Sequence, residues 1–178
     1  MRLMSYLTPD EVPVGYSLTR AKLQKGYTKE SLPRVARIPS TRLAEIAMAI
    51  RFGVVQKDRS IALTTEGLRK QRFHGRIGII INEHSHSAAE MVAAFAAENR
   101  LGHTIGSRSA GEVLGGANFR VGGEYRVRIP VTAWYTWSGR TIEGSGVHPD
   151  IPVEVQFEDL RDRTDRQLDA AIRFVQQI

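Results

Sequence analysis

The chain has 178 residues, of which 42% are apolar, and a formal net charge of +6. This length and composition fit a folded domain with a sizeable core and exclude a disordered chain. No apolar run approaches the roughly 18 residues that a membrane helix needs, so we expect no membrane span. There is no cysteine, which excludes a disulfide framework, a thiol nucleophile and a cysteine-ligated metal.

The positive charge is concentrated in the N-terminal part. Residues 1–75 carry 14 Lys and Arg against 6 Asp and Glu, a net charge of +8, whereas residues 76–178 carry 11 against 13, a net charge of −2. The basic residues are spread among prolines, glycines and acids, without a basic helix or interleaved aromatics. We therefore expect no nucleic-acid partner; binding through this part is the weaker alternative, and it would fall steeply with salt.

Prolines and glycines divide residues 1–75 into short elements, and we expect this basic segment to be loop-rich. One helix is predicted after Ser40 and Thr41, which could cap it, and Gly53 is its predicted stop. Its apolar positions share one face of the helix: Leu43, Ile46, Ala47 and Ile50. A short strand is predicted over residues 61–65.

The segment 76–155 begins with a strongly patterned unit. Residues 77–82 are β-branched and nearly all apolar, which predicts a strand buried on both faces. Residues 87–98 are rich in helix formers, and residues 102–106 read as another short strand. Strand, helix and strand in this order predict a βαβ-like unit with parallel pairing inside an α/β fold.

Two further strands and a final helix are predicted downstream. Residues 125–131 alternate apolar and basic side chains, as expected for a strand with one solvated face, and residues 134–139 resemble a strand ending in a turn. Apolar residues at helical spacing in 165–175 predict an amphipathic closing helix. We therefore describe the chain as three segments: 1–75, a central segment 76–155, and a helical end 156–178.

Ser87 stands where the predicted strand gives way to the predicted helix. Amides at a helix N-terminus point outward there and can stabilise a developing oxyanion while the serine hydroxyl faces solvent. The pair Ser87 and Glu90 also has the spacing of a capping box, in which each side chain binds the other residue's amide. From these residues alone, a nucleophile and a helix cap are both open interpretations.

The other candidate groups, histidines near Ser87 and glycines after residue 110, give weaker indications of a catalytic or binding role. His86 precedes Ser87 directly, and neighbouring side chains at a helix start diverge, so we do not expect it to act as the base. His84 and His86 lack a recognisable third ligand, so no metal is expected. The glycines after residue 110 have neither the Lys-Ser/Thr of a P-loop nor GxGxxG spacing, so they indicate turns.

Three ordered blocks resemble the motifs of tail-specific (C-terminal processing) serine peptidases. Residues 82–90 resemble the nucleophile motif, 105–112 its Val-Gly-x-x-Thr-x-Gly turn, and 143–150 its Glu-Gly-x-Gly-Val-x-Pro-Asp signature. The resemblance implies a crotonase-like α/β fold of ββα units, with a central sheet and packed helices. It also implies an acyl-enzyme mechanism on peptide or protein substrates without a cofactor. Ser87 matches the nucleophile, and the amide of Ala88 one oxyanion donor.

Departures from the family pattern concern the base. In the processing-protease branch a lysine stands at the position of Glu112, and every lysine of this chain lies at or before Lys70. The chain is therefore more similar to the tricorn-core branch, whose base is an upstream histidine oriented in part by a glutamate, which Glu143 could match. We expect that histidine, and a glycine-rich loop completing the oxyanion hole, to lie outside these 178 residues.

Several alternatives follow from the same departures. The chain could be a catalytically inactive fragment or a peptide-binding module of the same fold, rather than part of a serine-type endopeptidase. Relatives of this family are often exported, but the first residues lack the apolar run of a signal peptide, and the compartment is unknown. The substrate is unknown as well, and a homo-oligomer is left open.

Overall fold

The computed structural model describes residues 2–37, 41–50, 59–68 and 71–177. The chain forms two compact units, each built from two separate stretches. Unit 1 comprises Met1–Gln71 and Leu114–Thr141, and unit 2 comprises Arg72–Val113 and Ile142–Ile178. The division into segments 1–75, 76–155 and 156–178 follows the sequence and stays a prediction.

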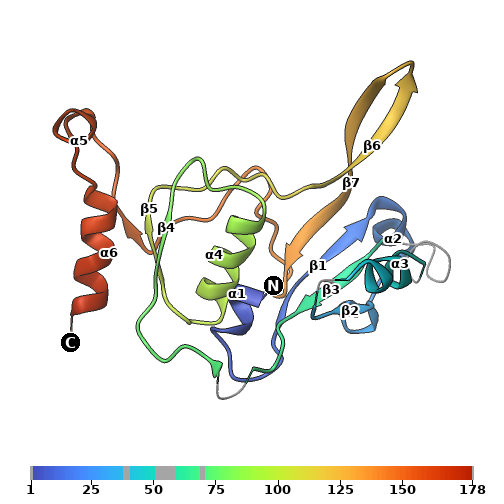
Figure 1. Cartoon of the computed structure of the whole chain (residues 1–178), viewed down its shortest axis with the longest axis horizontal. Coiled ribbons are helices and arrows are strands. Elements are labelled where there is room, and N and C mark those ends of the chain that lie inside the picture. Colours follow the sequence, from blue (N-terminus) through green and yellow to red (C-terminus); the bar gives the residue numbers. More distant parts are fainter. Residues whose placement is uncertain (1, 38–40, 51–58, 69–70, 178) are drawn as a thin grey trace. The chain divides into compact units, whose positions relative to one another are not determined.

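Unit 1 contains a five-stranded sheet with the order β2-β3-β1-β7-β6, in which only β2 and β3 pair in parallel. Its helices are short and lie in the first 50 residues (Figure 1). The strands are β1 (Pro13–Thr19), β2 (Arg34–Val35), β3 (Ile61–Thr64), β6 (Gly115–Gly122) and β7 (Tyr125–Thr136). The helices are α1 (Arg2–Ser5), α2 (Arg20–Lys25), a 3-10 turn at Lys29–Ser31 and α3 (Arg42–Ile50).

Strand β1 lies between β3 and β7 and contributes much of the core of unit 1. Its alternate residues Val14, Tyr16 and Leu18 are buried, as the two-residue period of a strand requires. Gly15 passes directly over the buried ring of Trp134, and a Cβ at this position would overlap the ring. This glycine therefore permits the close approach that buries Trp134.

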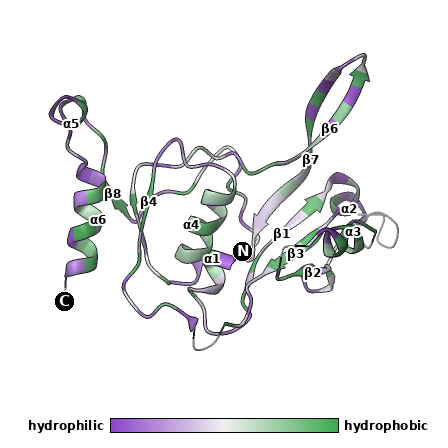
Figure 2. Cartoon of the chain, viewed as in Figure 1, coloured by the Kyte–Doolittle hydropathy of each residue, from purple (hydrophilic) through white to green (hydrophobic). Residues whose placement is uncertain are grey.

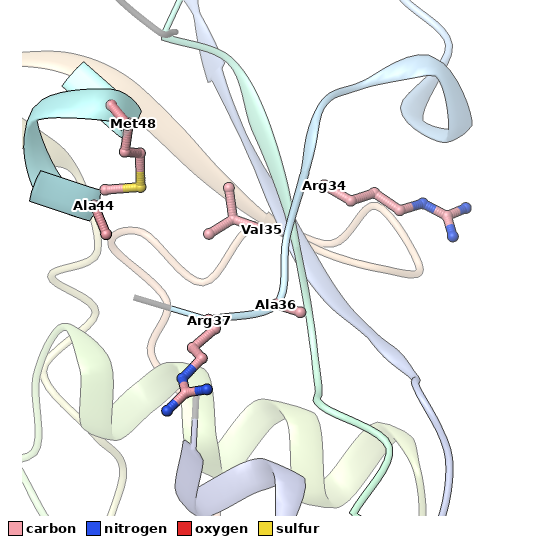
Figure 3. Close-up of a pocket in the computed structure, with 7 residues that line it drawn as sticks. Arg34, Val35, Ala36, Arg37, Ala44 and Met48 are labelled. Atoms are coloured by element: carbon pink, nitrogen blue, oxygen red, sulfur yellow. The ribbon is translucent and has the colours of Figure 1, made fainter. Parts of the chain in front are cut away.

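Helix α3 confirms the predicted helix, and Thr41 caps it by accepting a 3.4 Å hydrogen bond from the amide of Ala44. Its apolar face is largely exposed, since Leu43 is 82%, Ile46 55% and Ile50 53% exposed. Ser40, the other predicted cap residue, and the predicted stop at Gly53 lie outside the described residues. Figure 3 shows Val35 and Met48 among the residues lining a cavity of about 340 Å³ beside α3, with Arg34 pointing away from it.

Strands β6 and β7 continue beyond β1 as a two-stranded ribbon (Figure 1). Cross-strand pairs alternate between apolar pairs such as Phe119 with Val127 and the arginine pair Arg120 with Arg126, and Figure 2 shows the corresponding alternation of colours. All residues of β7 from Tyr125 to Pro130 are exposed. The prediction of one solvated face was therefore wrong here, because both faces of an unsupported ribbon meet solvent.

The two strands predicted over 125–131 and 134–139 are one continuous strand, β7. It ends in a turn closed by a 2.9 Å hydrogen bond from the amide of Thr136 to the carbonyl of Arg140. The second predicted strand thus corresponds to the end of β7 and the turn after it.

Unit 2 contains a parallel three-stranded sheet with the order β4-β5-β8. Its elements are β4 (Gly78–Ile81), α4 (Ala88–Glu98), β5 (His103–Gly106), β8 (Ile151–Pro152), α5 (Phe157–Asp162) and α6 (Arg166–Gln176). The predicted βαβ unit is confirmed as β4-α4-β5. Strand β4 is not buried on both faces as predicted, since Ile81 is buried but Ile80 is 39% exposed.

The two long helices of unit 2 differ in how they pack. Helix α4 has a run of four buried residues that includes Phe95, and Figure 2 shows it as largely apolar. Helix α6 confirms the predicted closing helix, but it buries Gln167 and Ala171 and exposes Leu168 and Ile172. No helix in the described ranges is both long and apolar enough to cross a membrane.

Candidate active site around Ser87

The three sequence blocks that resemble peptidase motifs meet within unit 2. The amide of Ala110, in the second block, donates a 3.0 Å hydrogen bond to the carbonyl of Ser85 in the first. The amide of Gly144, in the third block, donates a 2.8 Å hydrogen bond to the carbonyl of Gly111 in the second. Segments that are up to about 60 residues apart in sequence thus form one connected loop cluster.

Ser87 adopts an unusual backbone conformation at the start of α4, with φ 56° and ψ −116°. Few residues other than glycine have positive φ, and a non-glycine residue held outside the favoured regions costs about 1–3 kcal/mol. The side chain is exposed. Its backbone N–H turns inward, donating to the carbonyl of Glu112 at 2.9 Å and to Oε2 of Glu90 at 3.1 Å. A sharp turn of this kind presents a serine hydroxyl to solvent between a strand and a helix.

The capping-box interpretation of Ser87 and Glu90 is confirmed in arrangement, since both of its halves are recognisable. They differ in strength. The Glu90 carboxylate accepts a hydrogen bond from the Ser87 amide, whereas the Ser87 hydroxyl approaches the amide of Glu90 without making a capping hydrogen bond. The hydroxyl is therefore not consumed by the cap.

Ala88 is the first residue of α4, and its amide is one of the N–H groups that a helix start leaves without an intrahelical partner. The following amides are occupied: Ala89 donates to the carbonyl of His86 and Glu90 to that of Ser87. Among the hydrogen bonds of the described residues, none is donated by the amide of Ala88. It lies next to the Ser87 hydroxyl in the chain and is available to an incoming anion.

Glu143 lies in the third block and is half-buried. Its Oε2 accepts a 2.8 Å hydrogen bond from the amide of Val113, so it supports the loop that follows the second block. Glu112, at the position where processing proteases have lysine, is exposed and contributes backbone contacts to the cluster. Ser87 and Glu143 thus belong to one cluster, without a direct hydrogen bond between their side chains in the described part of the chain.

Glu90 and Ser109 are the residues whose importance the sequence did not reveal. Glu90 is fully buried and accepts four hydrogen bonds, one of them from the buried hydroxyl of Ser109 at 2.6 Å. The sequence indicated Glu90 as a partner in the helix cap and as the last residue of the block that resembles the nucleophile motif, but not as the centre of a hydrogen-bond network. For Ser109 the one signal available was its place at the position of the family's threonine in the second block.

No base for Ser87 is found in the part of the chain that the structure describes. There, no histidine or lysine makes a hydrogen bond to the Ser87 hydroxyl. His84 and His86 are exposed, and Nε2 of His84 lies 3.7 Å from Oε1 of Glu83. The same described ranges contain no cluster of three His, Asp or Glu side chains suited to a metal ion.

Comparison with known proteins gives the family. Residues 17–153 match the model of peptidase family S41. The chain belongs to this family. A carboxy-terminal-processing protease of Bartonella bacilliformis is 28% identical over 145 residues, which are 67% of this chain and 33% of that protein. The resemblance to tail-specific peptidases is thereby confirmed, and the chain spans about a third of the length of this relative.

Solved structures show the same fold. A peptidase-like protein from Parabacteroides merdae aligns with a TM-score of 0.65 at 15% identity, covering 98% of this chain and 46% of that one. Mature CPAF in complex with lactacystin aligns with a TM-score of 0.65 at 14% identity, covering 97% and 39%. The S41 chain therefore has the crotonase-like α/β fold. The family match over residues 17–153 shows that it is part of a serine-type peptidase domain.

Proposed function

We propose that the S41 chain supplies the acylation site of a serine-type endopeptidase, with Ser87 as nucleophile. The Ser87 Oγ attacks the carbonyl carbon of a peptide or protein substrate and forms an ester. Its proton passes to a base and then to the departing amine, and water hydrolyses the ester to release the acid and free Ser87. No step needs a cofactor.

The observation that carries this proposal is the pairing of an exposed, strained serine with a vacant amide. Ser87 has φ 56° and an exposed side chain, and in the described hydrogen-bond network the adjacent amide of Ala88 has no acceptor. An amide in this position stabilises the negative charge that develops on the substrate oxygen in the transition state. Any helix start leaves amides without an intrahelical partner, but an ordinary helix cap does not need the strained backbone that places the serine hydroxyl beside such an amide.

The base is supplied by a segment other than the described residues, in keeping with the histidine-dependent branch that Glu112 indicates. Glu143 orients that base. Its place beside the loop after the second block, fixed by the amide of Val113, supports this role. A nucleophile without its base loses most of its acceleration, so Ser87 reacts far more slowly when that base is absent than in a complete site.

One observation favours a second candidate, a catalytically inactive peptide-binding module of the same fold. In the described residues, the Ser87 hydroxyl has no hydrogen bond to a histidine or lysine. The two candidates differ in one measurable property. Only an acylation site makes Ser87 more reactive than other serines of the chain.

A fluorophosphonate probe tests this difference directly. We expect the probe to label the wild-type chain slowly but measurably at Ser87, because the Ala88 amide acts there without the base, and Ser87→Ala not at all. Ser31→Ala is the matched control, because the one hydrogen bond of the Ser31 hydroxyl among the described residues goes to the carbonyl of Thr28 in unit 1, and its loss leaves the site intact. Mass spectrometry of the labelled peptide identifies the modified residue. Equal labelling of the wild type and Ser87→Ala, or none of either, favours the inactive module.

A further inference from the structure

Glu90 is a buried carboxylate without a cationic hydrogen-bond partner among the described residues. It is 0% exposed in the first turn of α4. Buried charges are rare unless they are paired or fully hydrogen-bonded. The local structure must therefore supply Glu90 with enough donors to replace water.

Four donors converge on the two carboxylate oxygens, two on each. Oε1 accepts from the hydroxyl of Ser109 at 2.6 Å and from the amide of Gly111 at 2.7 Å. Oε2 accepts from the amide of Glu112 at 2.8 Å and from that of Ser87 at 3.1 Å. An ionised carboxylate accepts at both oxygens, whereas glutamine accepts at one and presents N–H groups at the other.

These bonds join the turn of the nucleophile to the loop of residues 109–112. Ser109 extends the network further, since its Oγ also accepts a 2.7 Å hydrogen bond from the amide of Val147 in the third block. Of the four bonds to Glu90, an ordinary capping box contains only the one from the Ser87 amide. The other three reach residues 19 to 22 positions away in sequence.

We infer that Glu90 is a positioning residue for Ser87. Its carboxylate, together with the Glu112 carbonyl, turns the Ser87 amide inward and so maintains the positive φ that directs the hydroxyl to solvent. The next amide, that of Ala88, then stays open for the substrate oxygen. This inference rests on the proposed role of Ser87, and Glu90 itself does not touch the substrate.

The test compares Glu90→Gln with a matched control, Asp159→Asn. Asp159 is also a nearly buried carboxylate in a capping box of unit 2, where it accepts from the amide of Gln156 at 2.7 Å and pairs with Arg166. Both substitutions replace one oxygen by an amide nitrogen. Only Glu90 is bonded to Ser87.

Two readouts are taken at conditions where the folded fractions of all proteins are equal. The first is the rate of fluorophosphonate labelling at Ser87, which we expect to fall about tenfold or more in Glu90→Gln and to stay unchanged in Asp159→Asn. The second is hydrogen exchange at the amides of Gly111 and Glu112, expected to be faster in Glu90→Gln only. If Glu90→Gln does not fold, Ser109→Ala replaces it. We then expect the same slower labelling of Ser87 and the same faster amide exchange in Ser109→Ala.

The outcomes separate this inference from the proposed function. Unchanged labelling in Glu90→Gln, or an equal fall in Asp159→Asn, overturns the positioning role, because either result reduces Glu90 to a structural cap. If the wild type is not labelled, the proposed nucleophile fails. Amide exchange then decides alone whether Glu90 maintains the turn: faster exchange at Gly111 and Glu112 supports it, and unchanged exchange overturns it.

Discussion

The loop cluster around Ser87 and the ribbon of β6 and β7 differ in how far the rest of the chain supports them. In the cluster, a strained serine and a buried carboxylate are supported by hydrogen bonds from three separate stretches of chain. In the ribbon, the two strands pair mainly with each other, and side chains such as Phe119 and Tyr125 are exposed. Mutations should therefore have large effects beside the cluster and small effects in the ribbon.

The largest expected difference comes from the same substitution at two phenylalanines. Phe95 is 1% exposed in α4, whereas Phe119 is 45% exposed in β6. Phe95→Ala should destabilise unit 2 by about 3–5 kcal/mol, because it leaves a cavity in a packed core. Phe119→Ala should cost about 1 kcal/mol or less.

Hydrogen exchange under native conditions measures both effects, since it reports the opening of each unit separately. Tryptophan fluorescence during denaturation adds a control, because Trp134 and Trp137 both belong to unit 1. If Phe119→Ala lowers stability as much as Phe95→Ala does, the contrast between ribbon and cluster is wrong. Such a result would indicate that the ribbon packs against another surface in solution.

A smaller difference is expected between two glycines with positive φ. Gly111 has φ +78°, and a Cβ there would lie 2.9 Å from the amide nitrogen of Gly146. Gly123, in the turn of the ribbon, has φ +52° and open space around it. Gly111→Ala should cost about 3 kcal/mol, because a backbone overlap adds to the unfavourable φ. Gly123→Ala should cost about 1 kcal/mol from φ alone.

Thermal or denaturant unfolding of the two alanine variants checks this prediction. Gly111→Ala should also slow the labelling of Ser87, since residue 111 donates to Glu90. A similar loss of stability in both variants would mean that the positive φ, and not the overlap with Gly146, determines the destabilisation by alanine.

The parts of the fold that the sequence predicted are those with local signals. The unit β4-α4-β5 is contiguous, and its apolar strand, helix formers and second strand each carry their own pattern. Strand β1 was missed because Pro13 and Gly15 suggested a loop, although Val14, Tyr16 and Leu18 alternate. The partner that buries it, β7, lies more than 100 residues away in sequence.

The candidate site was predictable to a similar extent. Ser87 stood out because a strand meets a helix there and because its neighbours resemble a family motif. The role of Glu90 was not predictable from spacing, since three of its four donors come from a loop that only the tertiary fold brings near. The helix α6 was evident from the sequence. Which of its side chains are buried was not, because the burial of Gln167 and the exposure of Leu168 depend on the packing of the rest of unit 2.

The smallest expected effect concerns Asp159, the second carboxylate of unit 2 that caps a helix. Its contribution to stability should depend on pH. The hydrogen bond from the amide of Gln156 holds the pKa of Asp159 below its usual range, and the Arg166 guanidinium beside it acts in the same direction. A carboxyl group with a lowered folded-state pKa stabilises the fold above its unfolded pKa of about 4. That contribution is lost as the pH falls through the folded-state value.

Asp159→Asn should therefore lower the stability of unit 2 at pH 7 and have progressively less effect in acid. Unfolding curves of the variant and the wild type, taken between pH 7 and strongly acidic pH, should converge as Asp159 becomes protonated in the wild type. Arg161→Ala is a suitable control: Arg161 pairs with the exposed Asp162 at 2.7 Å, and an exposed pair contributes little at any pH. A constant difference between Asp159→Asn and the wild type across the range would show that packing of the side chain, and not its charge, carries the effect.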